Sequence, residues 1–239
     1  MSEAQIPSET HRPNLYRTIR EMFASMGPRP LGPRLERIKA SQQYSGAKSK
    51  FINVVPDSTK LEVTFSGFIK QLLFGERTDF FPAHPLPTVR PDFADFLVSS
   101  EHLKFIWLGH STFLLHLNHK TLLIDPVFNN AGPLPFIGRR FQAPVIEPSA
   151  LPPIDIILIS HDHYDHLDMK TIQFFQDKKS IFLTTLGIGA YLEQWGIASG
   201  RITELDWWDR KNVDGITFTC TPVHFSVPKQ RDAWWQGKA

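Results

Sequence analysis

The sequence predicts an α/β domain, because segments with the period of β-strands alternate with segments of helical period from about residue 103 onward. Residues 154–160 form a largely apolar, isoleucine-rich run, as expected for a central strand that is buried on both faces. With 239 residues, of which 41% are hydrophobic, the chain can bury the core of one such domain and still carry an N-terminal extension.

The first 50 residues are basic. Nine Lys and Arg against four acids give them a charge of about +5, whereas the whole chain carries +2. Apolar residues at helical spacing between Leu15 and Met26 predict an amphipathic helix that Asn14 caps and Gly27 ends. Such a helix suits an anionic membrane surface, but we favour packing against the rest of the chain. The proline-rich stretch 28–33 is interpreted as a linker.

The remaining elements follow from periodicity. A second helical stripe covers residues 61–74, and Asn118-His119-Lys120 indicates a hairpin turn. His119 and His116, in the preceding strand, are interpreted as solvated. The chain is thus divided into a basic extension with one amphipathic helix (1–60) and a domain (61–239). From residue 103 we expect strands at 103–108, 112–117, 121–125 and 154–160, a helix at 168–176, a strand at 181–184, a helix at 187–195, and strands at 201–205 and 215–222.

Residues 160–168 carry the chemistry. His161, His163, Asp165 and His166 form the pattern H-x-H-x-D-H directly after the central strand. Imidazole and carboxylate groups are ligands of zinc and similar divalent ions. These side chains cannot all share one helix face, but on a tight loop they can converge from two sides. The pattern therefore favours a two-metal site, in which ions roughly 3.5–4 Å apart share a hydroxide, over a solvated polar loop.

Further segments accompany this motif, and together they resemble the metallo-β-lactamase superfamily, in particular its branch of N-acylphosphatidylethanolamine-hydrolysing phospholipase D. The H-x-H-x-D-H motif alone indicates only the superfamily. The segments 151–155 and 205–208 narrow the resemblance to the branch. The resemblance covers roughly residues 100–226. The segments are Trp107-Leu108-Gly109-His110-Ser111-Thr112, Leu123-Ile124-Asp125-Pro126-Val127-Phe128, Leu151-Pro152-Pro153-Ile154-Asp155, Glu204-Leu205-Asp206-Trp207-Trp208 and Thr221-Pro222-Val223-His224-Phe225-Ser226.

The resemblance implies an αββα sandwich, of which this chain is expected to hold the N-terminal part. It implies a first zinc site of His161, His163 and His224, and a second zinc site that includes Asp165 and His166. Asp165 would also orient the nucleophile as the catalytic residue. His110 is assigned to a position behind the metal ligands or at the substrate. Asp125, at a strand end, is expected either to hydrogen-bond a ligand histidine or to cap a helix or serve a turn.

The implied function is a zinc-dependent phosphodiesterase of the phospholipase D type that acts through a metal-bound hydroxide. A metal-dependent lactonase is the enzymatic alternative. No histidine follows His224, and the only later acid is Asp232, so the family's last ligands are not recognised in this sequence. One or two zinc ions are therefore expected here, and an inactive, truncated remnant is a third interpretation.

Composition limits the partners and the compartment. The charge of +2 is too small to indicate nucleic acid, and the single Cys220 excludes an internal disulfide. No apolar run reaches the 18 or so residues of a membrane span. We expect a cytoplasmic protein that acts on a small molecule or a phospholipid. Peripheral membrane contact and a homodimer are two further interpretations that the sequence allows.

Overall fold

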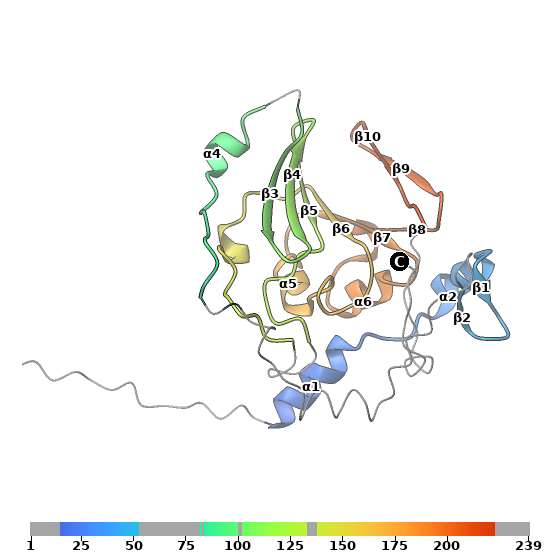
Figure 1. Cartoon of the computed structure of the whole chain (residues 1–239). Helices are drawn as coiled ribbons and strands as arrows, with labels where there is room; N and C mark the ends of the chain where they lie inside the picture. The colour runs from blue at the N-terminus through green and yellow to red at the C-terminus, as the bar shows by residue number, and fades with distance from the viewer. Residues whose placement is uncertain (1–14, 53–81, 83, 100–101, 133–137, 223–239) are drawn as a thin grey trace, which may run out of the picture.

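The structure is a computed structural model in which residues 15–52, 82, 84–99, 102–132 and 138–222 are described (Figure 1). The expected helix at 61–74 lies outside these ranges, as do His224 and Asp232. Within them the chain has a mixed α/β architecture built around one six-stranded sheet.

The six-stranded sheet has the order β3-β4-β5-β6-β7-β8 and is antiparallel in its first half and parallel in its second. The turn between β4 and β5 consists of Asn118 and His119, which both adopt positive φ, as a two-residue hairpin with the right-handed twist of its strands requires. All six strands of this sheet overlap strands that the sequence predicted, so those six predictions are confirmed. Their bounds are β3 Lys104–Gly109, β4 Thr112–Leu117, β5 Lys120–Ile124, β6 Ile156–Ile159, β7 Ile181–Thr185 and β8 Ile202–Leu205.

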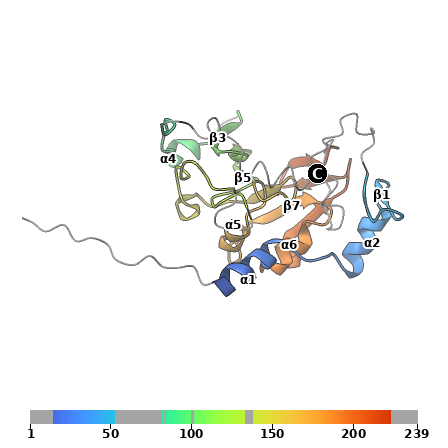
Figure 2. The ribbon, with the colours of Figure 1, turned by 60° about the horizontal axis from the view of Figure 1, so that its bottom comes forward.

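The two faces of the sheet are covered differently (Figures 1 and 2). Helices α5 (Met169–Phe174) and α6 (Gly189–Gln194) pack on one face over the main core, to which Ile157, Phe182 and Leu192 belong. On the other face a small cluster around Ile156 is covered by a hairpin of two strands. The hairpin consists of β9 (Arg210–Val213) and β10 (Ile216–Thr219). β9 was not predicted, because its residues are mostly polar and exposed.

The N-terminal extension contacts the domain. Helix α1 (Leu15–Ser25) lies beside α5 and α6 in both ribbon views, and the indole nitrogen of Trp195 donates to the carbonyl oxygen of Ala24 at 2.9 Å. The linker interpretation of residues 28–33 was wrong at its end, since α2 (Gly32–Ala40) begins there with a proline in its first turn. A short hairpin of β1 (Tyr44–Ser45) and β2 (Lys50–Phe51) follows.

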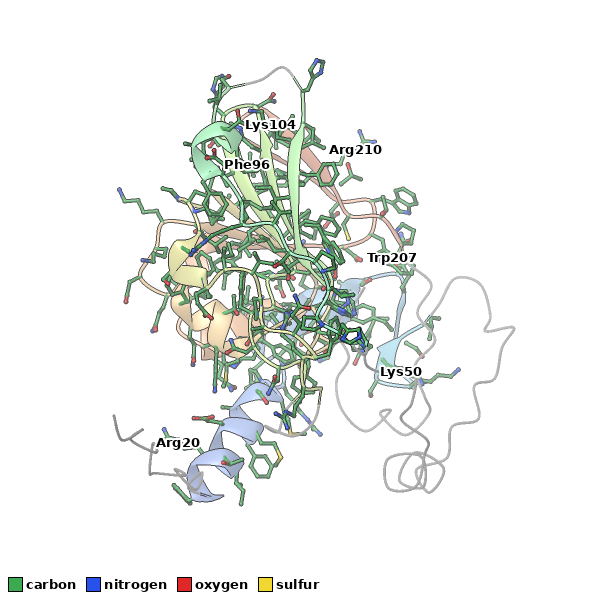
Figure 3. All side chains as sticks on the ribbon, turned by 60° about the vertical axis from the view of Figure 1, so that its left-hand side comes forward. Arg20, Lys50, Phe96, Lys104, Trp207 and Arg210 are labelled. Carbon is green, nitrogen blue, oxygen red and sulfur yellow. The ribbon has the colours of Figure 1, made fainter. Side chains whose placement is uncertain are left out.

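At the far end of the sheet, α4 (Phe93–Phe96) packs beside β3, where Figure 3 shows Phe96 and Lys104 close together. The Lys104 ammonium donates to the carbonyl oxygens of Asp95 and Val98 at 2.9 and 3.1 Å. The interpretation of His116 as solvated was wrong, because this residue is only 6% exposed and its ring lies 5.8 Å from that of Phe96. Short 3-10 turns occupy Pro148–Ala150 and Ser199–Arg201.

Candidate metal centre

The topology of the sheet brings three loops to one edge. β3 and β5 both run antiparallel to β4, so they share a direction, and β6 runs parallel to β5. The carboxyl ends of β3, β5 and β6 therefore lie on the same side, which is where open α/β sheets bind ligands. His110 follows β3, Asp125 follows β5, and residues 160–168 follow β6.

His110, Asp165 and His166 form a cluster with metal-ligand chemistry. Each offers one nitrogen or oxygen atom, and these three atoms lie within 4.8 Å of one another. The Nε2 atoms of His110 and His166 lie 2.9 and 3.8 Å from Oδ2 of Asp165. This set of two imidazoles and one carboxylate fits zinc and similar divalent cations. His110 thus adjoins the predicted ligands, and its contact with Asp165 fits either a metal ligand or a group that orients one.

Asp125 fixes the orientation of His166. It is 5% exposed, and its Oδ2 atom accepts from Nδ1 of His166 at 2.9 Å and from Oγ of Ser160 at 2.6 Å. A carboxylate only accepts, so Nδ1 of His166 carries the proton and Nε2 faces Asp165. This is the hydrogen bond to a ligand histidine that the sequence indicated for Asp125. Ser160, which sequence reasoning left without a role, is its second partner.

The same network orients His161. Because the single hydroxyl proton of Ser160 is donated to Asp125, its Oγ accepts from Nδ1 of His161 at 2.9 Å. That assignment leaves Nε2 of His161 for a metal. The ring centroid of His161 lies 4.0 Å from that of His166 and 4.8 Å from that of His163. Three of the predicted ligands are therefore already gathered at the loop.

The environment favours the metal-binding protonation states of His161 and Asp165. Burial, together with the neighbouring His166 and His163, lowers the pKa of His161 to about 4, so its imidazole is neutral at pH 7. For Asp165, burial opposes ionisation, but the hydrogen bond from His110 and the charge of His166 outweigh it and lower its pKa. His166 differs, because burial is outweighed by the hydrogen bond to Asp125, which raises its pKa, so a metal at its Nε2 atom has to displace a proton. Neutral imidazole and ionised carboxylate are the forms that ligate metals.

Backbone geometry also marks this edge. His110 and Asp125 adopt φ values of 47° and 41°, in the left-handed region that non-glycine residues rarely occupy. Such conformations occur preferentially at functional sites, where neighbouring contacts hold them. Ser111 supplies one such contact through its hydroxyl, which donates to the carbonyl oxygen of Asp165 at 2.8 Å. The loops after β3 and β6 are thereby joined.

Asp168 closes the loop. Its carboxylate caps α5 by accepting from the backbone nitrogen of Lys170 at 3.1 Å, as the predicted acid at this helix start suggested. It also accepts from the backbone and side-chain nitrogens of Asn129, at 2.9 and 2.8 Å. One buried acid therefore ties the loop after β5 to the helix that follows the metal loop.

A cavity of about 1170 Å³ opens beside the cluster and runs along β3. Its walls are mostly apolar, and His110 belongs to them. The indole nitrogen of Trp107 donates to the carbonyl oxygen of His110 at 2.7 Å. Two basic residues line the cavity as well: Arg140 is tied to the carbonyl oxygens of Asn129 and Val127, whereas Arg139 is exposed. Large apolar residues of the wall include Leu86, Val89, Phe96, Leu103, Phe105, Trp107 and Phe141.

The family model and the named relatives that match this chain point to the same family of hydrolases. Residues 120–238 match the family described as the Beta-lactamase superfamily domain. An uncharacterized protein of Mycobacterium tuberculosis is 40% identical over 149 residues, which are 61% of this chain and 40% of that protein. An N-acyl-phosphatidylethanolamine-hydrolyzing phospholipase D of Caenorhabditis elegans is 33% identical over 56% of this chain and 40% of its own length.

A third relative is a metal-dependent hydrolase of Saccharolobus solfataricus, 32% identical over 51% of this chain and 50% of its own length. The chain thus spans half or less of the length of these relatives. The matched family segment includes Asp125 and the whole metal loop but begins after His110.

Proposed function

The chain belongs to the beta-lactamase superfamily of metal-dependent hydrolases, and on that basis we propose that it is a phosphodiesterase that cleaves a glycerophospholipid in the manner of a phospholipase D. The names of the relatives from Caenorhabditis elegans and yeast support this choice of reaction, since both include N-acyl-phosphatidylethanolamine hydrolysis.

The observation that carries the proposal is the shared position of His110. This residue belongs to the cluster with Asp165 and His166 and also to the wall of the apolar cavity. A lipid whose acyl chain lies along β3 would therefore present its phosphate at the cluster. Apolar lining with a few convergent polar groups is the usual character of a small-molecule site.

The residues of the chain have distinct roles in this reaction. A divalent ion, when bound, supplies Lewis acidity that stabilises charge developing on the phosphoryl group. Asp165 is ionised at neutral pH and orients the attacking water by accepting its hydrogen bond. Asp125 and Ser160 hold the imidazoles of His166 and His161 in fixed tautomers. Arg139, at the cavity wall, contacts the phosphate.

The test is a direct assay. The 239-residue chain, loaded with Zn²⁺, is incubated with N-acylphosphatidylethanolamine in detergent micelles, and the products are identified by mass spectrometry. We expect phosphatidic acid and the N-acylethanolamine, and we expect a chelator or the Asp165→Ala substitution to abolish both products. His119→Ala, which changes an exposed histidine of the β4–β5 turn, is the matched control and should retain the activity.

A parallel assay with an acyl lactone distinguishes the alternative chemistry, in which water attacks a carbonyl carbon. Turnover of the lactone without turnover of the phospholipid would contradict the proposal and favour a lactonase. Turnover of the phospholipid by cleavage on the glycerol side of the phosphate would contradict the phospholipase D assignment while retaining the phosphodiesterase.

A further inference from the structure

The metal loop has a contact that none of the roles above explains. Asp162 lies between His161 and His163, and its Oδ2 atom accepts a hydrogen bond from the Tyr191 hydroxyl at 3.1 Å. Tyr191 belongs to α6 and is 6% exposed. A buried tyrosine ring has little freedom to move, and its hydroxyl usually has a hydrogen-bond partner. The bond from Tyr191 therefore restricts the position of Asp162. We infer that Tyr191 is a positioning residue for the metal loop, and that the N-terminal extension holds Tyr191 in place.

The first part of this inference follows from the position of Asp162. Its neighbours on both sides are predicted ligands, so a shift of the Asp162 backbone moves two imidazoles at once. Groups that orient metal ligands from behind typically change metal affinity 10- to 100-fold when they are removed. Tyr191 acts one residue further from the metal than Asp125 does, because it bonds Asp162 rather than a histidine.

The second part follows from what packs behind the Tyr191 ring. Gly27, with φ +71°, lies so close that a Cβ atom built there would overlap the ring of Tyr191. At the C-cap of α6, Trp195 packs edge-on against Tyr191 with 5.6 Å between ring centroids. Trp195 donates in turn to the carbonyl oxygen of Ala24 at 2.9 Å. The end of α1 therefore supports the tyrosine from behind.

Arg34 provides a second anchor between the extension and the start of α6. Its guanidinium contacts Glu204, which is 7% exposed, and pairs with Glu193 at 2.9 Å. Glu204 also accepts from the backbone nitrogens of Gly187 and Gly189, at 2.6 and 2.9 Å. The start of α6 is thus linked to Arg34 through Glu204, and its end is bonded to the extension directly through Glu193 and Trp195.

This role depends on the metal centre but not on the substrate proposed above, so it is tested without substrate. Zn²⁺ affinity of the full chain is measured by competition with a chromophoric chelator. We expect Tyr191→Phe to weaken the affinity about tenfold. The variant keeps the ring and removes one oxygen, so the unfolding midpoint should change little. Tyr44→Phe is the control, because the Tyr44 ring packs on Phe51 in the β1–β2 hairpin and should not affect the metal.

A double-mutant cycle tests the coupling. If Tyr191 acts through Asp162, then Tyr191→Phe combined with Asp162→Ala weakens Zn²⁺ binding no more than Asp162→Ala alone. Asp162→Asn, which keeps an acceptor oxygen, should recover most of the affinity. Effects of Tyr191→Phe and Asp162→Ala that simply add, or an unchanged affinity in Tyr191→Phe, would overturn the inference.

The support from the extension is tested at two glycines. Gly27→Ala places a methyl group into the Tyr191 ring, whereas Gly32→Ala, at a φ of +56°, adds a methyl group with no described atom within 4 Å. Both changes carry the same kind of backbone strain. We expect faster amide hydrogen exchange across residues 160–166 of the metal-free protein in Gly27→Ala alone. Equal exchange in the two variants would exclude support of the metal loop by the extension.

Discussion

The two sides of the metal loop differ in how their side chains are held. On the α6 side, Tyr191 and Glu204 are 6% and 7% exposed, and each makes hydrogen bonds to a loop or a neighbouring element. On the β3 side, Phe105 and Trp107 are 64% and 60% exposed along the cavity that reaches His110. Buried hydrogen-bonded groups fix geometry, while exposed aromatic groups remain available to a ligand. Mutations on the α6 side should therefore change the free energy of unfolding, whereas mutations on the β3 side should change the KM for the substrate.

The largest expected effect is a loss of unfolding free energy on the α6 side. Glu204→Ala should lower the free energy of unfolding by about 3 kcal/mol, because it leaves the Arg34 guanidinium and two backbone nitrogens without their buried partner. Urea denaturation followed by circular dichroism measures this.

Glu193→Ala is the matched control for that change. Glu193 pairs with the same Arg34 but is 40% exposed, so its loss should cost less than about 0.5 kcal/mol. Similar losses in the two variants would remove the distinction between a buried anchor and a surface pair.

A smaller effect, in a different observable, is expected on the β3 side. Trp107→Ala should raise the KM for a long-chain phospholipid about tenfold and change the unfolding free energy by less than about 1 kcal/mol, because the indole is already largely exposed. Steady-state kinetics with long- and short-chain substrates measure it, and the short-chain KM should change little.

Trp208→Ala controls for the loss of any exposed tryptophan. Trp208 is 66% exposed and does not line the cavity, so both KM values should stay as in the unsubstituted protein. A rise in the long-chain KM in both variants would show that the cavity along β3 does not select the acyl chain.

The smallest effect is expected at Arg139, which is exposed at the cavity. Arg139→Ala should raise the KM for the phosphodiester about threefold, because a solvated guanidinium contributes little to binding a phosphate. Arg139→Lys should recover part of the loss. A lower free energy of unfolding with an unchanged KM would mean that Arg139 supports the loop instead of contacting the substrate.

Much of the sheet was predictable, because its strands carry local signals. The apolar run that ends at Ile159 and the alternation in β4 indicate strands without any tertiary information. The same alternation places His116 with Thr112 and Leu114 on the buried face of β4, so the burial of His116 was readable from the sequence. β9 lacked such a signal, because its pairing with β10, and not its own polar residues, makes it a strand.

The site was predictable where its residues adjoin one another in the sequence. His161, His163, Asp165 and His166 stand within six residues of one another, and the structure gathers His161 and His166 with Asp125 and His110. The contact between Asp162 and Tyr191 joins residues 29 positions apart on two elements, so no local pattern indicates it. The assignment of His224 stays a prediction.

Membrane contact, a homodimer and a cytoplasmic location also stay predictions. None of the helices in the described ranges combines the length and the apolar composition that a membrane span requires. Helix α1 keeps Tyr16 and Phe23 exposed at 76% and 63% while its other side contacts the domain. Packing on the domain and an exposed apolar stripe therefore coexist in this helix.

The measurement that tests the metal centre most directly is the metal content of the purified chain after equilibrium dialysis against Zn²⁺, determined by plasma emission spectroscopy. We predict at least about one ion per chain, with a clear loss in His166→Ala and no change in His119→Ala. Absence of bound metal in the unsubstituted chain, or equal losses in the two histidine variants, would contradict a metal centre at the loop of residues 160–168.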